Sequence, residues 1–140
     1  MKRQRYILDT NICAYILRGK YDLNERVKAV GMQNCYISEI TVAELLYGME
    51  YGKLKGGPKY KDQHLEQFFD DINVLPVRPA FSLFASEKAR LRIAGTPVAE
   101  FDLLIGCTAV ANKMIMVTQN VKDFQGINNI QIENWIERNK

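Results

Sequence analysis

Tyr6-Ile7-Leu8-Asp9-Thr10-Asn11 joins a short apolar run to a polar turn and then to a helical pattern. The apolar run predicts a strand, so Asp9 lies at the carboxyl end of that strand. Open α/β sheets bind their ligands at this end. Asp9 also suits the N-cap of the following helix, because its carboxylate can accept a backbone N–H bond. The residues alone leave both roles open.

Short apolar runs alternate with longer helical patterns along the chain, which is typical of an α/β domain with a parallel sheet covered on both faces. Strands are predicted at residues 6–8, 35–37, 72–75 and 114–118, with an edge strand at 130–132. Helices are predicted at residues 11–17, 23–30, 41–53, 61–71, 81–94 and 102–111. We expect a three-layer α/β/α fold around a short parallel sheet of four to five strands.

Length and composition limit the number of domains. A chain of 140 residues with 47% hydrophobic composition can bury one core and is too short for two ordinary domains. Gly56, Gly57 and Pro58 interrupt the stretch from Lys53 to Lys61, which predicts an exposed turn between two helices. We expect a single domain over residues 1–140.

Charge and cysteine content restrict the protein class and its compartment. A formal charge of +3 is too mild to indicate a nucleic-acid-binding protein by itself. Cys13, Cys35 and Cys107 are odd in number and lack paired metal-ligand spacing, so neither a disulfide framework nor a zinc site is indicated. The basic start leads into only a short apolar run, which is neither a signal-peptide core nor a membrane span. We expect a cytoplasmic protein that does not enter a membrane.

Glu44 is the second candidate acid. Thr41 and Glu44 match a capping box, which would explain the glutamate without any ligand. If Ser38 caps the helix instead, Glu44 lies one turn inside it and its carboxylate is free. Helical spacing predicts that Val42, Leu45, Leu46 and Met49 form the core stripe and that Glu44 lies on roughly the opposite side.

Asp102 begins a helical pattern that is apolar on nearly all sides, which predicts a buried helix with an acid at its positive end. An N-cap role is the alternative and is compatible with a functional one. Gly106 and Ala109 share the face of Asp102, so this side of the helix is narrow and is expected to pack tightly against the sheet.

Asp123 and Asn120 follow the predicted strand that ends at Thr118, so they are candidate neighbours of Asp9. Loop stabilisation through bonds to their own backbone is the alternative for both residues. Asp9, Glu44, Asp102 and Asp123 are all predicted at one edge of the sheet. Clustered carboxylates raise one another's pKa unless a cation compensates them, and Mg²⁺ prefers such oxygen ligands. The acids therefore predict a divalent metal site.

With these residues assembled, the chain resembles the PIN-domain proteins, and specifically the VapC ribonuclease toxins of bacterial toxin–antitoxin pairs. The resemblance spans nearly the whole length, and each motif alone is weak whereas the ordered set is specific. The motifs are Leu8-Asp9-Thr10-Asn11, Ser38-x-x-Thr41-x-x-Glu44-Leu45-x-Tyr47-Gly48, Asp102-Leu103-Leu104-Ile105 and Thr118-x-Asn120-x-x-Asp123-Phe124.

This resemblance implies a PIN-like fold and a Mg²⁺-dependent endoribonuclease in which Mn²⁺ can substitute. It implies that Asp9, Glu44 and Asp102 are the core metal ligands and that Asp123 completes the acidic pocket. Four further polar residues are expected to surround the pocket or contact substrate: Asn11, Ser38, Thr118 and Asn120. Glu100, beside Asp102, is a secondary candidate.

The mechanism implied is attack of a metal-activated water on a phosphodiester, with no nucleophile from the protein. A histidine-pair mechanism is excluded because His64 is the only histidine, and we expect it at the surface. The resemblance also implies a structured RNA substrate, tRNA above all, inhibition of translation and a VapB-like antitoxin partner.

Basic and aromatic residues elsewhere in the chain allow further interpretations. The Lys53–Lys61 turn with Arg18, Lys20, Tyr51 and Tyr60 could hold the RNA backbone and stack on bases, although solvated helix ends explain these residues equally well. Tyr47 and Tyr51 suggest a homodimer surface. The alternative function is a non-catalytic RNA- or protein-binding module, and a phosphatase-like enzyme is disfavoured because no Asp-x-Asp pair follows the first strand.

Overall fold

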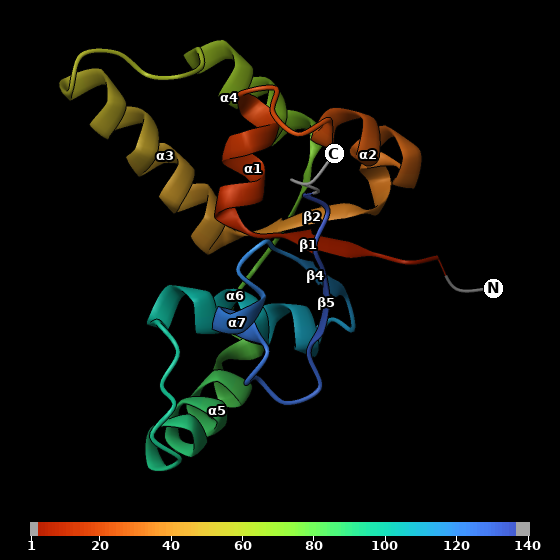
Figure 1. The fold of residues 1–140 in the computed structure, drawn as a ribbon, viewed down its shortest axis with the longest axis vertical. Helices are drawn as coiled ribbons and strands as arrows, with labels where there is room; N and C mark the ends of the chain where they lie inside the picture. The colour runs from red at the N-terminus through yellow and green to blue at the C-terminus, as the bar shows by residue number, and fades with distance from the viewer. Residues whose placement is uncertain (1–2, 137–140) are drawn as a thin grey trace.

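The computed structural model describes residues 3–136, and a parallel five-stranded sheet forms its centre (Figure 1). The strand order is β3-β2-β1-β4-β5. The strands are β1 (Tyr6–Leu8), β2 (Cys35–Ser38), β3 (Asn73–Leu75), β4 (Ile115–Val117) and β5 (Gln131–Glu133). All four pairings are parallel, which confirms the predicted sheet, and β5 is at the edge as expected.

Helices cover both faces of the sheet, as Figure 1 shows, with α1 to α4 on one side and α5 to α7 on the other. The helices are α1 (Thr10–Leu17), α2 (Leu23–Val30), α3 (Glu39–Leu54), α4 (Asp62–Asp71), α5 (Phe81–Ile93), α6 (Glu100–Ala111) and α7 (Val121–Phe124). Within residues 3–136 there are also two short 3₁₀ helices, Met32–Asn34 and Arg78–Ala80. The three-layer architecture agrees with the prediction.

Two hydrophobic cores follow from the alternation of side chains along the strands. Leu8 and Val117 lie in the core beneath α1 to α4, whereas Ile7 and Met116 lie in the core beneath α5 to α7. All four side chains are fully buried. Because both faces are covered, the two central strands β1 and β4 are apolar runs rather than alternating with polar residues.

A buried glutamate anchors the segment that follows α7. The carboxylate of Glu87 on α5 accepts two hydrogen bonds from Arg90, at 2.7 and 2.8 Å, and one from the backbone N–H of Asn128 at 2.7 Å. Arg90 also donates to the carbonyl of Gly126 at 2.7 Å. The hydrogen bonds from Arg90 are the main reason that the pKa of Glu87 lies below its ordinary value. This ion pair therefore fixes the chain just after the helix that carries Asp123.

The three cysteines are buried free thiols within the part of the chain that the structure describes. Burial raises the pKa of Cys35 and of Cys107 to about 11, so these thiols are protonated at neutral pH. Among residues 3–136, no helix combines the length and the apolar character needed to cross a membrane.

Candidate active site

Asp9 lies between the ends of two neighbouring strands. It directly follows β1, and its backbone N–H bonds to the carbonyl of Val117 at the end of β4, at 3.0 Å. The Thr118 hydroxyl donates to Asp9 Oδ2 at 2.5 Å, and the backbone N–H of Ile12 donates to Oδ1 at 2.8 Å. Asp9 therefore caps α1 and also lies at the carboxyl edge of the sheet, so the cap does not exclude the ligand-binding position that the sequence left open.

Asp9 is buried, with only 4% of the residue exposed. Its pKa is raised to about 6, first by burial and then by repulsion from Asp102 and Glu44. The hydrogen bonds from Thr118 and Ile12 act in the opposite direction, because they favour the ionised form. Asp9 therefore lies close enough to Glu44 of α3 and Asp102 of α6 for their negative charges to repel its own.

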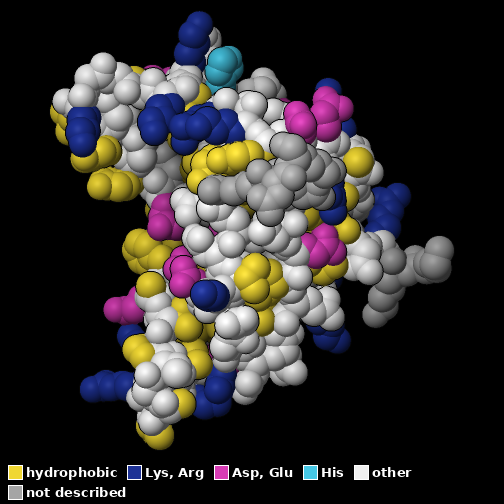
Figure 2. All heavy atoms as spheres, viewed as in Figure 1, with side chains coloured by type: hydrophobic (Ala, Val, Ile, Leu, Met, Phe, Trp, Pro, Cys, Tyr) yellow, Lys and Arg dark blue, Asp and Glu magenta, His cyan; other side chains and the backbone are white. Residues whose placement is uncertain are grey.

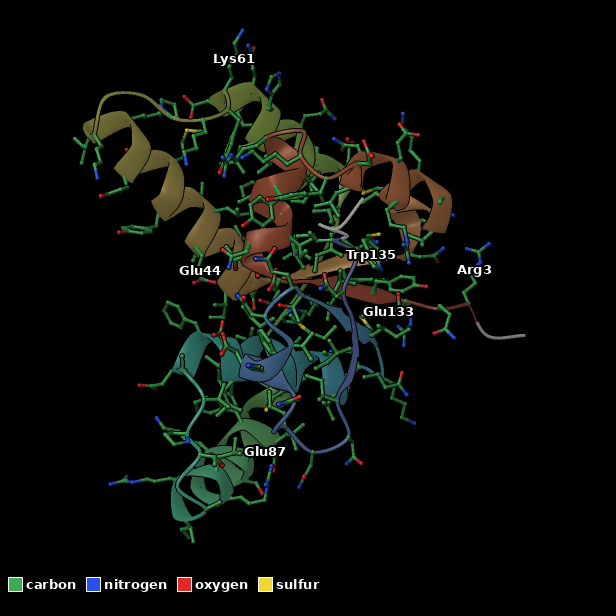
Figure 3. All side chains as sticks on the ribbon, in the orientation of Figure 1. Arg3, Glu44, Lys61, Glu87, Glu133 and Trp135 are labelled. Carbon is green, nitrogen blue, oxygen red and sulfur yellow. The ribbon has the colours of Figure 1, made fainter. Side chains whose placement is uncertain are left out.

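Glu44 points from α3 towards the start of α1, as its position in Figure 3 shows. Ser38 is the N-cap of α3, and its hydroxyl accepts the Thr41 N–H at 3.2 Å, so the capping box of Thr41 and Glu44 is wrong. The freed carboxylate accepts a hydrogen bond from the Thr10 hydroxyl at 2.6 Å. The alternative start of the helix at Ser38 is confirmed.

Asp102 lies in the first turn of α6 and interacts electrostatically with each of the other three acids. The N-cap is Ala99, so the N-cap role for Asp102 is wrong. Its pKa is raised by burial and by repulsion from Glu44 and Asp123. Since Asp102 also raises the pKa of Asp9, all three other acids lie within its electrostatic reach.

Asp123 reaches this region from α7. The backbone N–H of Asn120 donates to the Thr118 hydroxyl at 3.0 Å, and the Asp123 N–H donates to the carbonyl of Asn120 at 3.0 Å. Thr118 therefore connects this loop to Asp9. Asp102 and Asp123 line the same cavity of about 460 Å³, together with Lys122.

Gly106 permits the close approach of α6 to the segment after α7. A Cβ at this position would lie 2.4 Å from Ile127 Cδ1 and 3.4 Å from Phe124 Cδ1. The prediction that this side of α6 is narrow is confirmed. The prediction that it packs against the sheet is wrong, because the side chains of Ile127 and Phe124 fill the space instead. This packing holds α6 and α7 together, and these two helices carry Asp102 and Asp123.

The remaining candidates differ in their positions. Ser38 and Thr118 are fully buried, whereas Asn11 and His64 are exposed. Glu100 forms an ion pair with Lys88 at 3.0 Å and its side chain is 70% exposed, so its carboxylate is held in a surface ion pair. The prediction omitted Thr10 as a site residue, although its place directly after Asp9 was a signal.

The donor set suits a hard divalent cation, because it consists of oxygen atoms and its carboxylates carry excess negative charge. Among residues 3–136, no three histidine, cysteine or acidic side chains are gathered closely enough to hold an ion. The carboxylates of Asp9 and Glu44 accept hydrogen bonds from hydroxyl and backbone N–H groups. The chemistry of these residues fits a metal, and the repulsion among Asp9, Glu44 and Asp102 is the strain that a cation would relieve.

Comparison with known proteins assigns the family. The PIN domain family matches residues 6–128. The tRNA(fMet)-specific endonuclease VapC of Shigella flexneri is 31% identical over 133 residues, which cover 94% of this chain and 98% of that protein. Ribonuclease VapC2 of Haemophilus influenzae is 30% identical over 134 residues, with the same two coverages of 94% and 98%.

Solved structures agree with these relatives. VapBC2 from Rickettsia felis, bound to a DNA fragment from its promoter, has a TM-score of 0.82 at 28% identity and covers 94% of this chain and 99% of that chain. DNA-bound VapBC from Salmonella typhimurium has a TM-score of 0.81 at 31% identity and covers 94% and 98%. The motifs, the sheet order and these similarities together show that the chain belongs to the PIN-domain family and, within it, to the VapC ribonucleases.

Proposed function

We propose that this chain is a divalent-metal-dependent endoribonuclease, with Mg²⁺ as its metal and Mn²⁺ as a substitute. The observation that supports this most is the position of Asp102, which lies within the electrostatic reach of Asp9, Glu44 and Asp123. A stable fold does not need acids placed so that Asp102 and Glu44 raise the pKa of Asp9 and that Glu44 and Asp123 raise the pKa of Asp102. A metal-dependent nuclease does, and the relatives are named as ribonucleases and endonucleases.

Asp9, Glu44 and Asp102 would hold the metal, and Asp123 would complete the pocket. A bound Mg²⁺ would lower the pKa of a water and neutralise negative charge on the phosphate. Thr118 and the Ile12 N–H orient the carboxylate of Asp9, and the Thr10 hydroxyl orients that of Glu44. These contacts keep the carboxylate oxygens directed at one edge of the sheet, so that little reorganisation is needed when the substrate binds.

The biological role proposed is that of a cytoplasmic toxin that inhibits translation by cutting structured RNA, with tRNA favoured. A relative named as a tRNA(fMet)-specific endonuclease supports this substrate class. The solved relatives are VapBC complexes, which supports a VapB-like antitoxin as partner. We also propose a homodimer, because α3 exposes Leu46, Tyr47, Tyr51 and Leu54.

The proposal is tested by incubating purified protein with labelled tRNA in Mg²⁺ or Mn²⁺ and following cleavage on denaturing gels. EDTA should stop the cleavage. Asp102→Asn should lower kcat by at least about 100-fold, because a metal-dependent site loses several kcal/mol of transition-state stabilisation without one of its ligands. Calorimetric titration with Mn²⁺ gives a second readout, in which the variant should lose most of its affinity.

Glu100→Gln is the matched control, because it removes a carboxylate two residues away that points to Lys88. This variant should cleave RNA and bind Mn²⁺ like the wild type. If Asp102→Asn also keeps both properties at matched metal concentration, the ligand assignment is wrong. RNA binding without cleavage or Mn²⁺ uptake by the wild type would favour the non-catalytic module.

A further inference from the structure

A second cavity lies on the α1 and α4 side of the sheet, and none of the four acids of the candidate active site lines it. Its volume is about 810 Å³, and it opens between the end of α1 and the turn that leads into α4. The residues that matter for its chemistry are Arg18, Pro58, Lys59, Tyr60, Lys61 and His64. None of these residues has a role in the proposed metal site.

The cavity is rich in cations without acidic partners. Among the residues that the structure describes, Arg18, Lys59 and Lys61 form no ion pair, whereas Asp62, which also lines the cavity, is paired with Lys53 at 3.0 Å. Glu66 is the remaining acid in the lining. Lys61 projects outward from the start of α4 in Figure 3, and Lys and Arg side chains gather over this part of the surface in Figure 2. The cavity therefore favours an anion.

An aromatic ring is fixed beside these cations. Tyr60 is half-buried and packs on the core beneath α1 to α4. Its hydroxyl lies close enough to Arg18 for that positive charge to oppose the rise in the pKa of Tyr60 that burial causes. A fixed aromatic surface next to unpaired cations suits a ligand that carries both phosphates and planar bases.

The cavity is connected to the acids by one short helix. Asp9 is the N-cap of α1, and Leu17, the last residue of that helix, lines the cavity together with Arg18. A helix of eight residues is roughly 12 Å long at 1.5 Å per residue. A single strand of RNA that enters the acidic site can therefore reach the cavity within a few nucleotides.

We propose that this cavity is a subsite for the phosphate backbone of a single-stranded stretch of the RNA substrate, with Tyr60 stacking on a base. This inference rests on the proposed ribonuclease function. Arg18, Lys59 and Lys61 contact phosphates there, so the cavity raises affinity for RNA and sets its path to the acids without taking part in hydrolysis.

The test is the double variant Arg18→Gln and Lys61→Gln, with Lys28→Gln and Arg92→Gln as the control that removes the same two charges elsewhere. Binding is measured by fluorescence anisotropy with a labelled single-stranded 20-nucleotide RNA, in an Asp9→Asn background that prevents cleavage. The cavity variant should bind about tenfold more weakly, and the slope of log Kd against log salt should fall by roughly 1.4, or about 0.7 per lost phosphate contact. The control should stay within about twofold of its parent.

Cleavage by the same variants in the wild-type background separates the two proposals. The cavity variant should raise KM with kcat nearly unchanged, because it loses binding that ground state and transition state share. If wild-type protein cuts no RNA but the cavity variant still loses RNA affinity, the ribonuclease function fails and the subsite stands. Equal loss in variant and control, or no loss in either, overturns the subsite. The subsite would also be overturned if the cavity variant kept its affinity for RNA but no longer bound a labelled polyglutamate peptide that the wild type binds. That result would assign the cavity to an acidic protein segment.

Discussion

Asp9 combines a structural role with an energetic cost. It caps α1, and it is also a buried carboxylate whose pKa is raised to about 6. Because this pKa lies above the ordinary value of 3.8, the folded protein binds the proton more tightly than the unfolded chain does. The contribution of Asp9 to stability is therefore complete below about pH 4 and is lost as the pH rises through about 6.

We predict that Asp9→Asn stabilises the metal-free protein at pH 7.5 by about 1 to 3 kcal/mol, since one pKa unit corresponds to about 1.4 kcal/mol. Asparagine keeps the cap, because its side-chain oxygen can accept the Ile12 N–H. The advantage should shrink below pH 6 and vanish near pH 4. Urea unfolding in EDTA across this pH range measures it.

Mg²⁺ provides the complementary measurement, because it should stabilise the wild type and leave Asp9→Asn nearly unchanged. Glu100→Gln, which loses an exposed ion pair, should change stability by less than about 1 kcal/mol at any of these pH values. An Asn variant less stable than the wild type at pH 7.5 would show that the hydrogen bond from Thr118 outweighs the burial of charge.

Two helical glycines have opposite surroundings, and this difference gives a prediction at the scale of the elements. In α3, a Cβ added at Gly48 meets no atom within 4 Å, whereas one added at Gly106 in α6 lies 2.4 Å from Ile127 Cδ1. Gly48→Ala should stabilise the fold by roughly 0.5 to 1 kcal/mol through helix propensity. Gly106→Ala should destabilise the fold by about 1 kcal/mol or more, because the cost of overpacking against Ile127 exceeds the gain in helix propensity.

Combining Gly106→Ala with Ile127→Val tests the cause, since valine lacks the Cδ1 atom. The double variant should recover part of the loss, and a double-mutant cycle by chemical denaturation measures the coupling. Additive effects of the two substitutions would contradict the proposed contact. Gly48→Ala should also keep RNA cleavage unless the substrate approaches that backbone.

Most elements were predictable because their patterns are local. The bounds of β1 and α2 agree with the prediction, and α3 begins two residues earlier because Ser38 caps it. The four-residue helix α7 was missed, since so short a polar segment has no periodicity to detect. Leu46 was wrongly placed in the core. It is 49% exposed, because the distal part of α3 extends beyond the sheet in Figure 1 and buries only one narrow face.

At the scale of the whole molecule, the topology explains which part of the site was predictable. Asp9 and Thr118 follow β1 and β4, which are adjacent parallel strands, so their proximity follows from the sheet alone. The approach of Glu44 to Asp102 depends instead on contact between α3 and α6, which belong to opposite layers. Neither periodicity nor spacing specifies how two layers meet, so the central position of Asp102 required the structure.

The assembly of two molecules provides the last prediction. Tyr47 and Tyr51 stack with ring centroids 6.0 Å apart and are 69% and 49% exposed, and Leu54 on the same helix is 90% exposed. Burial of this face against a second copy would remove apolar area from water, so Tyr51→Glu should convert a dimer into a monomer in sedimentation velocity. Ile93→Lys is the control, because Ile93 is 88% exposed on α5 in the other layer. If Ile93→Lys dissociates the dimer and Tyr51→Glu does not, the interface lies on α5. If the wild type is a monomer at micromolar concentration, the proposed dimer is wrong.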